Sequence, residues 1–392
     1  MTLIAAVGQA QSRDARKAGM QATHQALHQL GTLSPALCLV MVPYRYDPEQ
    51  VINGVASLLS NTPTLGCSVS SALSQEGAFS HSVIVAILAG DALQAETHWF
   101  PTYSQASAET AIRISQLLSY EQQPAEQVIV FADGLNGNAD EFLAELPAGL
   151  SVLGGLSSGD MRSANSFQIA GTQSGMGGLA AAFLRGSIKT GIGYGHGWHA
   201  VGSHFRVTRS RGFWLRTLDG HPASESYSNL FGRPAREWAF PPLNYMSRIY
   251  PLGFEQLYTD ELLVRAPLRV EADGSFRMNS GLREGSDAYL MVGSPSDCKD
   301  AARQATRQAL QALGTAKPVF ALVLIDLSWQ LLLQAHPGEE IQAIQEELGL
   351  NVPLAGGYTL GQIVPPRDLN SRPDLLNQHI LVAIFGENEK AK

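Results

Sequence analysis

Polar residues follow short, glycine-containing apolar runs at several places in this chain of 392 residues. The clearest stretch, Leu153-Gly154-Gly155-Leu156-Ser157-Ser158-Gly159-Asp160, joins an apolar run to a carboxylate through paired glycines. Asp160 lies six residues after Gly154, and Gln362 lies six residues after Gly356. Asp160 could bind an ammonium group and Gln362 a carboxyl or amide group, so we expect these loops to contact a small ligand. The alternative is that both side chains brace their own loops.

A second candidate is the glycine-rich segment 191–199, which contains His196 and Trp198. Its glycine content predicts a loop, or a strand edge that another segment approaches closely. An imidazole, an indole and bare backbone N–H groups could together bind one small anionic or aromatic ligand. The alternative is a turn that carries surface histidines.

Other single residues could take part in a ligand site. Asp133 follows a buried strand, where open α/β sheets bind ligands, although Asp133-Gly134 is also an ordinary turn. Tyr358 could stack on a ligand and Arg265 could clamp a carboxylate, with packing or solvation as the alternative for Arg265. Cys67 follows a strand glycine, where a thiol pKa can be lowered, although a small buried thiol is the simpler interpretation.

The sequence gives little support for catalysis. No histidine is positioned beside Cys67, and the segment around it lacks the second glycine of a nucleophile elbow. Cys38, Cys67 and Cys298 lie far apart, so we expect neither disulfides nor a cysteine metal site. We therefore expect a binding protein and not an enzyme.

The elements that would position these residues form an internal repeat. Each unit reads as helix, buried strand, helix, strand, glycine loop and outgoing strand, and Gly66, Gly154 and Gly356 are expected to end the strands before the loops. The continuous apolar runs are typical of strands covered on both faces. We predict an α/β fold in which repeated helix-strand-helix-strand units form two mixed-sheet domains around a shared cleft, with His196 and Trp198 at its rim. The segments that carry the repeat are 22–31 with 305–314, 35–42 with 318–325, and a middle copy at 107–119, 128–132, 139–146 and 178–184.

A different pattern separates the second and third units. It predicts strands at 205–210, 212–217, 262–270, 276–278 and 289–292, and a helix at 224–230. We place the domain boundary near Gly220, giving domains at residues 1–219 and 220–387 and a polar tail at 388–392.

Composition limits the partners. The formal net charge is −8 and no basic block is present, which argues against nucleic acid. No apolar run reaches the roughly 18 residues of a membrane span, and the first residues do not resemble a signal peptide. We expect a cytoplasmic protein without a membrane anchor.

Several of these motifs occur together in one known family. Gly66-Cys67-Ser68, His196-Gly197-Trp198, residues 218–223 (LDGHPA) and residues 353–363 (PLAGGYTLGQI) resemble, in order and spacing, the motifs of the FIST family of bacterial sensory proteins. The resemblance covers nearly the whole chain. Three features depart from the family pattern. Gln362 stands where the family usually has Glu, Ser71-Ala72 stands for Gly-Glu, and Asp326 lies where many relatives carry Ser-Cys.

The resemblance implies a FIST N and a FIST C domain and a stand-alone sensor of a small ligand, for which amino acids or their derivatives are proposed in the family. Its output would pass through a partner protein. Some relatives are described as haem-containing nitric oxide sensors that regulate a histidine kinase, which is the alternative function. In that case His196 would be the axial haem ligand; otherwise the sequence identifies no cofactor.

Overall fold

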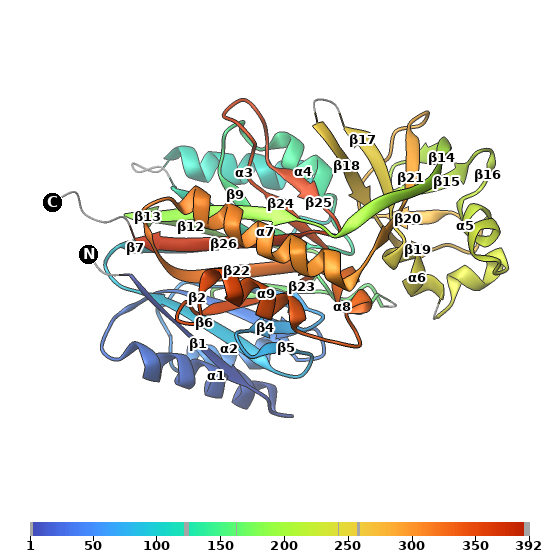
Figure 1. The fold of residues 1–392 in the computed structure, drawn as a ribbon. Coiled ribbons are helices and arrows are strands. Elements are labelled where there is room, and N and C mark those ends of the chain that lie inside the picture. Colours follow the sequence, from blue (N-terminus) through green and yellow to red (C-terminus); the bar gives the residue numbers. More distant parts are fainter. Residues whose placement is uncertain (1–2, 121–124, 162, 242, 257–258, 388–392) are drawn as a thin grey trace.

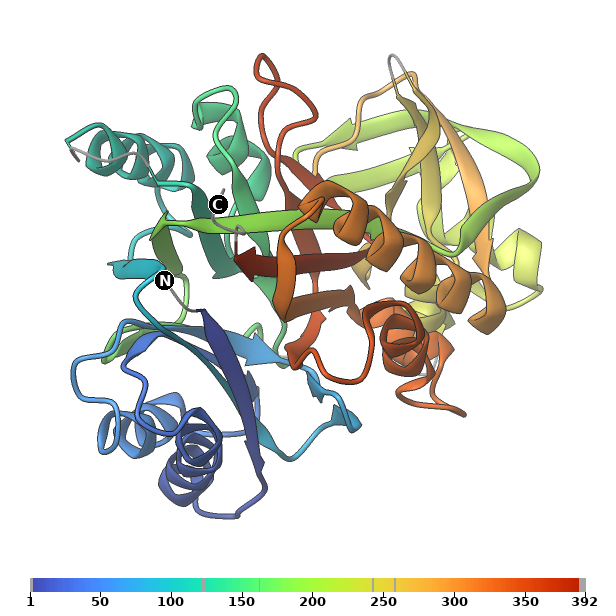
Figure 2. The same ribbon diagram turned by 60° about the vertical axis from the view of Figure 1, so that its left-hand side comes forward.

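The computed structural model describes residues 3–387, apart from 121–124, 162, 242 and 257–258. The predicted tail at 388–392 lies outside the described residues. Within the described chain, the strands form three six-stranded sheets and one eight-stranded sheet (Figures 1 and 2). No described helix is both long and apolar enough to cross a bilayer.

The first sheet combines strands from the N-terminal third of the chain with a hairpin from further along. Its central pair, β2 and β3, is parallel and the remaining neighbours are antiparallel. Helices α1 (Ala15–Leu30) and α2 (Pro48–Ala56) pack on it. In spatial order its strands are β1 (Ile4–Ala10), β6 (Val83–Ala89), β2 (Pro35–Pro43), β3 (Thr64–Val69), β10 (Gln168–Ala170) and β11 (Gln173–Gly175).

The second sheet has the same kind of order, with helices α3 (Ser107–Tyr120) and α4 (Ala139–Glu145). Its parallel pair is β8 and β9. In spatial order its strands are β7 (Leu93–Phe100), β12 (Leu179–Gly186), β8 (Gln127–Asp133), β9 (Val152–Ser157), β24 (Gly361–Val364) and β25 (Asp374–Leu376).

The third sheet carries helices α7 (Pro295–Leu313), α8 (Leu327–Leu332) and α9 (Glu339–Leu348). Its parallel pair is β22 and β23. In spatial order its strands are β13 (Ile188–Gly195), β26 (Ile380–Glu387), β22 (Lys317–Asp326), β23 (Leu354–Thr359), β4 (Ala72–Ser74) and β5 (Gly77–Phe79).

A short hairpin completes each of these sheets, and in each case it comes from a segment whose other strands lie in a different sheet. The hairpin β4–β5 joins β23, β10–β11 joins β3, and β24–β25 joins β9. The three sheets therefore exchange hairpins in a closed cycle. This three-sheet body is the larger part of the molecule.

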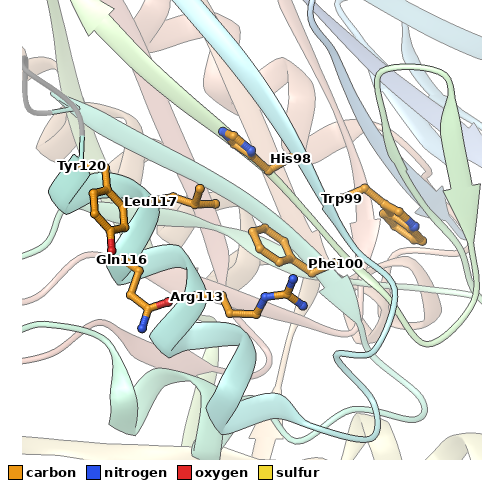
Figure 3. Close-up of a pocket in the computed structure, with 7 residues that line it drawn as sticks. All are labelled: His98, Trp99, Phe100, Arg113, Gln116, Leu117 and Tyr120. Carbon is orange, nitrogen blue, oxygen red and sulfur yellow. The ribbon is translucent and has the colours of Figure 1, made fainter.

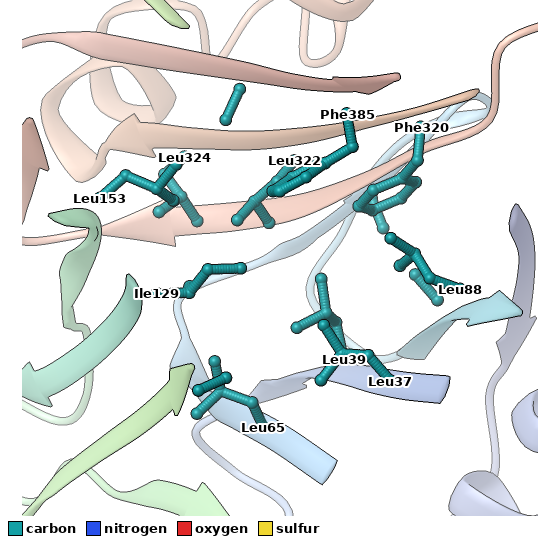
Figure 4. Close-up of a cluster of buried hydrophobic side chains, with 14 of the residues drawn as sticks. Leu37, Leu39, Leu65, Leu88, Ile129, Leu153, Phe320, Leu322, Leu324 and Phe385 are labelled. Carbon is teal, nitrogen blue, oxygen red and sulfur yellow. The ribbon is translucent and has the colours of Figure 1, made fainter. Parts of the chain in front are cut away.

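The inner faces of the three sheets share one apolar core. Figure 4 shows side chains of all three sheets converging, among them Leu39, Ile129 and Leu322. The opposite face of each sheet is covered by its helices, in separate clusters. The strands are therefore buried on both faces, which explains the continuous apolar runs in the sequence.

The eight-stranded sheet lies at one side of the body in both views (Figures 1 and 2). Along it lie helix α5 (Ala223–Phe231), the 3₁₀ helix η1 (Ala235–Ala239) and α6 (Leu243–Ile249). The predicted single strand at 262–270 is divided into two strands at Ala266. In spatial order the strands are β18 (Thr259–Arg265), β17 (Leu252–Gln256), β21 (Asp287–Gly293), β14 (Trp198–Arg211), β15 (Trp214–Leu218), β20 (Phe276–Met278) and β19 (Pro267–Val270), with β16 (His221–Pro222) paired to β15.

Helix ends follow local sequence signals. Asp14 caps α1 by accepting a hydrogen bond from the Lys17 N–H, and Gly31 ends the helix at a φ of 65°. Helix α7 begins at Pro295, and the Ser294 side chain caps it by accepting a hydrogen bond from the Asp297 N–H. The predicted mixed α/β class is confirmed, and the division into two parts is consistent with the structure.

Candidate ligand site

The strands that contain the three predicted glycines meet at their carboxyl ends. There, a residue just beyond or at the end of one strand donates its backbone N–H to a carbonyl in the strand of another sheet. These hydrogen bonds are Ser70 to Tyr358 at 3.1 Å, Leu360 to Leu156 at 2.8 Å and Ser158 to Ser68 at 3.0 Å. We call this set the central ring. The segments that follow the three glycine-containing strands therefore bond to one another, and the predicted shared cleft is not confirmed.

Gly66, Gly154 and Gly356 lie inside their strands, so the prediction that they end the strands is wrong. A Cβ at any of them would overlap a carbonyl oxygen of the neighbouring parallel strand. Glycine is therefore required for the close approach of two strands, and the turn comes several residues later.

A buried polar cluster lies beside the central ring, between the body and the eight-stranded sheet. Its acidic member is Asp326, the last residue of β22, which is fully buried. Asp326 Oδ1 accepts from the Ser328 N–H at 2.9 Å and the Ser328 hydroxyl at 2.8 Å, and Oδ2 has no hydrogen-bond partner. The departure from the family pattern noted at this position therefore places a carboxylate at the carboxyl end of a parallel strand.

Arg248, on α6, lies against this carboxylate. Its side chain is 4% exposed, and Nη2 is 3.6 Å from Asp326 Oδ1, too far for a good hydrogen bond. Nε and Nη1 have no partner. Burial lowers the pKa of the Arg248 guanidinium, and the charge of Asp326 partly offsets this. Two of the three guanidinium nitrogens are thus buried without a hydrogen-bond acceptor.

Arg265, at the end of β18, is a second buried cation. It is 4% exposed; Nη1 donates to the Val264 carbonyl at 3.2 Å and Nε has no partner. Burial lowers the pKa of its guanidinium, against the attraction of Asp140 and Asp374. Its charge also helps to lower the pKa of His379, after burial and the charge of His196. No described carboxylate forms an ion pair with Arg265.

Buried amides surround these charges. Asn279 and Asn377 both donate from Nδ2 to the Leu360 carbonyl, at 3.0 and 3.2 Å. Gln378 Nε2 donates to the Arg248 carbonyl at 3.1 Å, and Gln330 Nε2 donates to the Ser71 hydroxyl at 2.9 Å. The amide oxygens without a partner are Asn279 Oδ1, Asn377 Oδ1, Gln378 Oε1 and Gln330 Oε1. We call Arg248, Arg265, Asp326 and these four amides the polar cluster.

Buried polar groups are normally hydrogen-bonded, and each exception calls for an explanation. The polar cluster offers N–H donors from two cations, and acceptors from a carboxylate and several amides. A small molecule with both an anionic group and hydrogen-bond donors could satisfy both sets. The cluster also follows the carboxyl ends of parallel strands, where α/β sheets bind ligands.

His196 lies next to this cluster and contacts His379, with ring centroids 4.6 Å apart. Burial lowers the pKa of His196 to about 4, with a smaller contribution from His199, so the imidazole is neutral near pH 7. Its Nδ1 accepts from the Trp198 N–H at 3.2 Å. Among the described residues, no group of His, Cys, Asp and Glu side chains could hold a metal ion.

Trp198 is not at a rim; this part of the prediction is wrong. Its side chain is buried against Trp329, with ring centroids 6.2 Å apart. Trp198 Nε1 donates to the Ile249 carbonyl at 2.9 Å, and Trp329 Nε1 donates to the Gln378 carbonyl at 2.7 Å. The two indoles thus position the segments that carry Arg248 and Gln378.

Asp133 has a structural role, contrary to its predicted one. Its Oδ1 accepts from the N–H groups of Leu135 and Asn136, at 2.8 and 2.9 Å, and Oδ2 accepts from the Gly177 N–H at 2.7 Å. These bonds close the turn after β8 and hold the start of β12. The ordinary turn considered as the alternative is therefore the better account.

Asp160 and Gln362 form hydrogen bonds with different partners. Asp160 exchanges backbone hydrogen bonds with Asn165, and its Oδ2 accepts from Ser163 Oγ at 2.9 Å. Gln362 is fully buried in β24 opposite Gly155, which itself lies inside β9. With its amide oxygen turned toward Asp326, Gln362 accepts from the Asp326 N–H at 3.0 Å. Gln362 therefore braces the strand end that carries the acidic member of the cluster.

Tyr358 and Cys67 are both buried in packed interiors. The Tyr358 hydroxyl donates to the buried Glu340 carboxyl, and burial raises the pKa values of both groups. Burial likewise raises the pKa of the Cys67 thiol. Neither side chain is free to stack on a ligand or to react as a thiolate, so the simpler interpretation of Cys67 holds.

A separate hollow of about 270 Å³ lies between β7 and α3 (Figure 3). Aromatic side chains, including His98, Phe100 and Tyr120, line it together with Arg113. Tyr120 is 84% exposed, so the hollow opens widely to solvent. No member of the polar cluster lines it, and we do not assign the ligand to it.

Most members of the polar cluster were not predicted. Arg265 was considered as a carboxylate clamp, and Asp326 was singled out only as a departure from a family pattern. Arg248, Asn279 and Gln330 carry no local signal, because each reaches the site through contacts distant in the sequence. A weak signal was available in Asn377-Gln378-His379, which is a polar run directly before the buried strand β26.

Fold and site together describe a mixed α/β protein whose buried polar cluster lies between two structural parts. The chain belongs to the FIST family: the FIST N domain description matches residues 36–221 and the FIST C domain description matches residues 223–365. FIST domains are small-ligand sensory domains of signal transduction. No curated protein matches the chain.

Solved structures show only distant similarity. A chorismatase is 10% identical, with 98% of this chain and 99% of that chain covered at a TM-score of 0.35. A cyanuric acid hydrolase from A. caulinodans is 12% identical over 47% of this chain and 71% of that chain, at a TM-score of 0.26. PurL from T. maritima is 9% identical over 98% and 72%, at a TM-score of 0.25. We draw no functional argument from these similarities.

Proposed function

We propose that this protein is a stand-alone sensory protein whose small ligand is an amino acid or a derivative, bound at the polar cluster. The observation that supports this proposal is the set of buried, unpartnered groups around Arg248 and Asp326. A carboxylate of the ligand would accept from Arg248 and Arg265, and its ammonium group would donate to Asp326 and the amide oxygens. The proposal includes output through a partner protein and no catalytic step.

The energetic argument follows from the cost of burial. A buried ion without its hydrogen bonds costs several kcal/mol, which a ligand with complementary groups would recover. The buried polar cluster therefore lowers the stability of the unliganded protein and raises its affinity for the ligand. A ligand that carries only one of the two charges would leave the other half of the cluster unsatisfied.

A panel of free amino acids, their amides and their N-acetyl derivatives, tested by thermal denaturation, distinguishes these cases. We expect a zwitterionic amino acid to raise the melting temperature, since a ligand at 100 times its Kd contributes about 2.7 kcal/mol. Its amide lacks the carboxylate and its N-acetyl form lacks the ammonium group, so each should give a smaller shift. Equal shifts for all three forms, or no shift with any compound, would contradict the proposal.

The haem alternative depends on His196 as an axial ligand. Its neutral imidazole is suited to metal binding, because a protonated ring cannot coordinate iron. Its surroundings do not fit a haem, because Trp198 and Trp329 pack on each other and His379 covers the ring. An absorption spectrum with added haemin tests this. We expect no Soret band, and a band that disappears in His196→Ala would favour the haem sensor and a histidine kinase partner.

A further inference from the structure

Arginine side chains gather on one face of the eight-stranded sheet. Across neighbouring strands, Arg211 lies opposite Trp214, Trp214 opposite Arg277, and Arg277 opposite Arg269. Residues that oppose each other in a sheet share a face, and Arg216 joins them because it lies two residues after Trp214. We call Arg211, Trp214, Arg216, Arg269 and Arg277 the arginine patch.

The arginine patch faces away from the core. Leu215 and Phe276, which point to the opposite face, are 1% and 0% exposed. A surface hollow of about 460 Å³ is lined by Arg211, Gly212, Trp214 and Arg216. At its edge the guanidinium carbon of Arg277 lies 5.1 Å from the centre of the Trp214 ring. An aromatic side chain is thus surrounded by cations.

The positive charge of the patch is largely uncompensated. Within the described chain, Arg269 forms an ion pair with Glu271 at 2.8 Å, and no ion pair is found for Arg211, Arg216 or Arg277. Asp273 is close enough to Arg216 for that charge to contribute to the lowering of its pKa, although hydrogen bonds from Ser275 contribute more. The whole chain nevertheless has a net charge of −8. A local positive surface on an acidic protein needs its own explanation.

We propose that the arginine patch docks an acidic segment of a partner protein. Arg and Trp are the residues that most often dominate binding energy at protein interfaces, and arginine pairs well with carboxylates. Charge complementarity argues for a short acidic segment, since a long nucleic acid would extend onto the acidic remainder of the surface. The patch would supply the output surface that a stand-alone sensor needs. The inference does not depend on the identity of the ligand.

The probe for this surface is a short fluorescein-labelled Glu-Asp peptide, with binding followed by fluorescence anisotropy at low ionic strength. We expect saturable binding that weakens as salt is added. The double variant Arg211→Ala/Arg216→Ala should weaken it about tenfold, and Trp214→Leu by a smaller factor. Both arginines are exposed, so we expect the double variant to keep the melting temperature of the natural chain.

The matched control is Arg13→Ala/Arg16→Ala, which removes the same charge from exposed residues near α1. We expect it to change the peptide Kd less than about twofold, as for charges beyond a Debye length. Equal weakening by both double variants would overturn the proposal, as would an absence of peptide binding. An oligonucleotide of matched charge that binds more tightly than the peptide at the same salt would also overturn it, in favour of nucleic acid.

Discussion

Among the described residues, Arg265 donates to the Val264 carbonyl and forms no ion pair with a carboxylate. A buried charge in this situation costs free energy that nothing in the unliganded protein repays in full. Residues of this kind persist where binding or catalysis requires them. Stability and ligand affinity should therefore respond in opposite directions when Arg265 is replaced.

We expect Arg265→Met to raise the free energy of unfolding of the unliganded protein by roughly 1–3 kcal/mol, because it replaces a buried unpaired charge by an apolar chain of similar length. The same variant should lose the ligand-induced rise in melting temperature. Urea denaturation and the thermal panel measure the two effects. Arg283→Met, at an exposed position, should change neither. A loss of unliganded stability in Arg265→Met would show that this guanidinium serves the fold.

His196 should make the protein sensitive to mild acid. Its pKa falls from 6.5 in the unfolded chain to about 4 in the folded one. Between these values the unfolded chain binds a proton that the folded chain does not, so the free energy of unfolding decreases as the pH falls from 6.5 towards 4. The full difference is roughly 3 kcal/mol. Above pH 6.5 the His196 imidazole is neutral in both states, so the stability lost at lower pH is fully present there.

Urea denaturation between pH 7.5 and 4 measures this dependence. We expect His196→Gln to show a shallower loss of stability on acidification than the natural chain, since the titrating ring is gone. His24→Gln, at an exposed helix position, is the control and should follow the natural chain. Identical pH profiles for all three proteins would contradict the depressed pKa.

Whether the role of a single residue could be predicted from the sequence depended on whether its contacts are close in the sequence. Arg265 was considered as a carboxylate clamp, with packing or solvation as the alternative, and the structure buries its side chain. Asp133 was misjudged, because its acceptors are occupied by its own turn and by Gly177, which lies 44 positions away in the chain. Arg248 could not have been found, since only the folding of α6 against α8 brings it to Asp326.

At the scale of elements, glycine determines how closely helices approach strands. A Cβ at Gly193 of β13 would overlap the Ala305 carbonyl of α7, and a Cβ at Gly8 of β1 would overlap the Ala22 carbonyl of α1. Segment 191–199 was predicted to be a loop or a strand edge that another segment approaches closely. The structure shows the edge strand β13 over most of it, and α7 is the segment that approaches. The matching pairs also fit the predicted equivalence of 22–31 with 305–314, which a superposition of the two units would test.

Gly193→Ala should destabilise the protein by about 2–4 kcal/mol, because α7 must move away from β13 and lose packing along its length. Gly195→Ala is the control in the same strand, where the added Cβ would meet its nearest atom, the Ala301 carbonyl oxygen, at 3.5 Å. Its effect should stay below about 1 kcal/mol. Chemical denaturation compares the two. Equal effects would mean that the helix adjusts freely.

Helices and strands with a strong hydrophobic pattern or a clear capping residue could be predicted from the sequence. The sheet that each strand joins could not. The ends of α1 follow from Asp14 and Gly31. The positions of Gly66, Gly154 and Gly356 inside strands were missed, because a glycine that admits a neighbouring backbone looks the same in sequence as one that turns the chain. The hairpins β4–β5, β10–β11 and β24–β25 are too short to show which sheet they join.

At the scale of the whole molecule, the polar cluster draws residues from both structural parts. Arg248 and Arg265 come from the part with the eight-stranded sheet, and Asp326 and Gln330 come from the body. A ligand bound among them would cross-link the two parts. Their relative position is therefore the quantity that a partner could detect.

Hydrogen exchange should report this coupling. With the amino acid that gives the largest thermal shift, we expect slower exchange of amides in α6 and in residues 377–379, since binding must suppress their local opening. Amides of α1, which packs on α2, β1 and β6 of the first sheet, provide the internal reference. Protection confined to the hollow between β7 and α3 would place the ligand there and contradict our assignment.

The closed cycle of hairpin exchange has a consequence for how this chain can come apart. Each sheet of the body is completed by a hairpin from another segment of the chain. Removing any one segment would therefore disrupt two sheets: the sheet that it mainly forms and the sheet that its hairpin completes. In such an arrangement, no third of the body can unfold at low free-energy cost while the other two stay intact. The body should yield as one cooperative unit under force or denaturant, and fragments severed between its thirds should regain structure only when mixed.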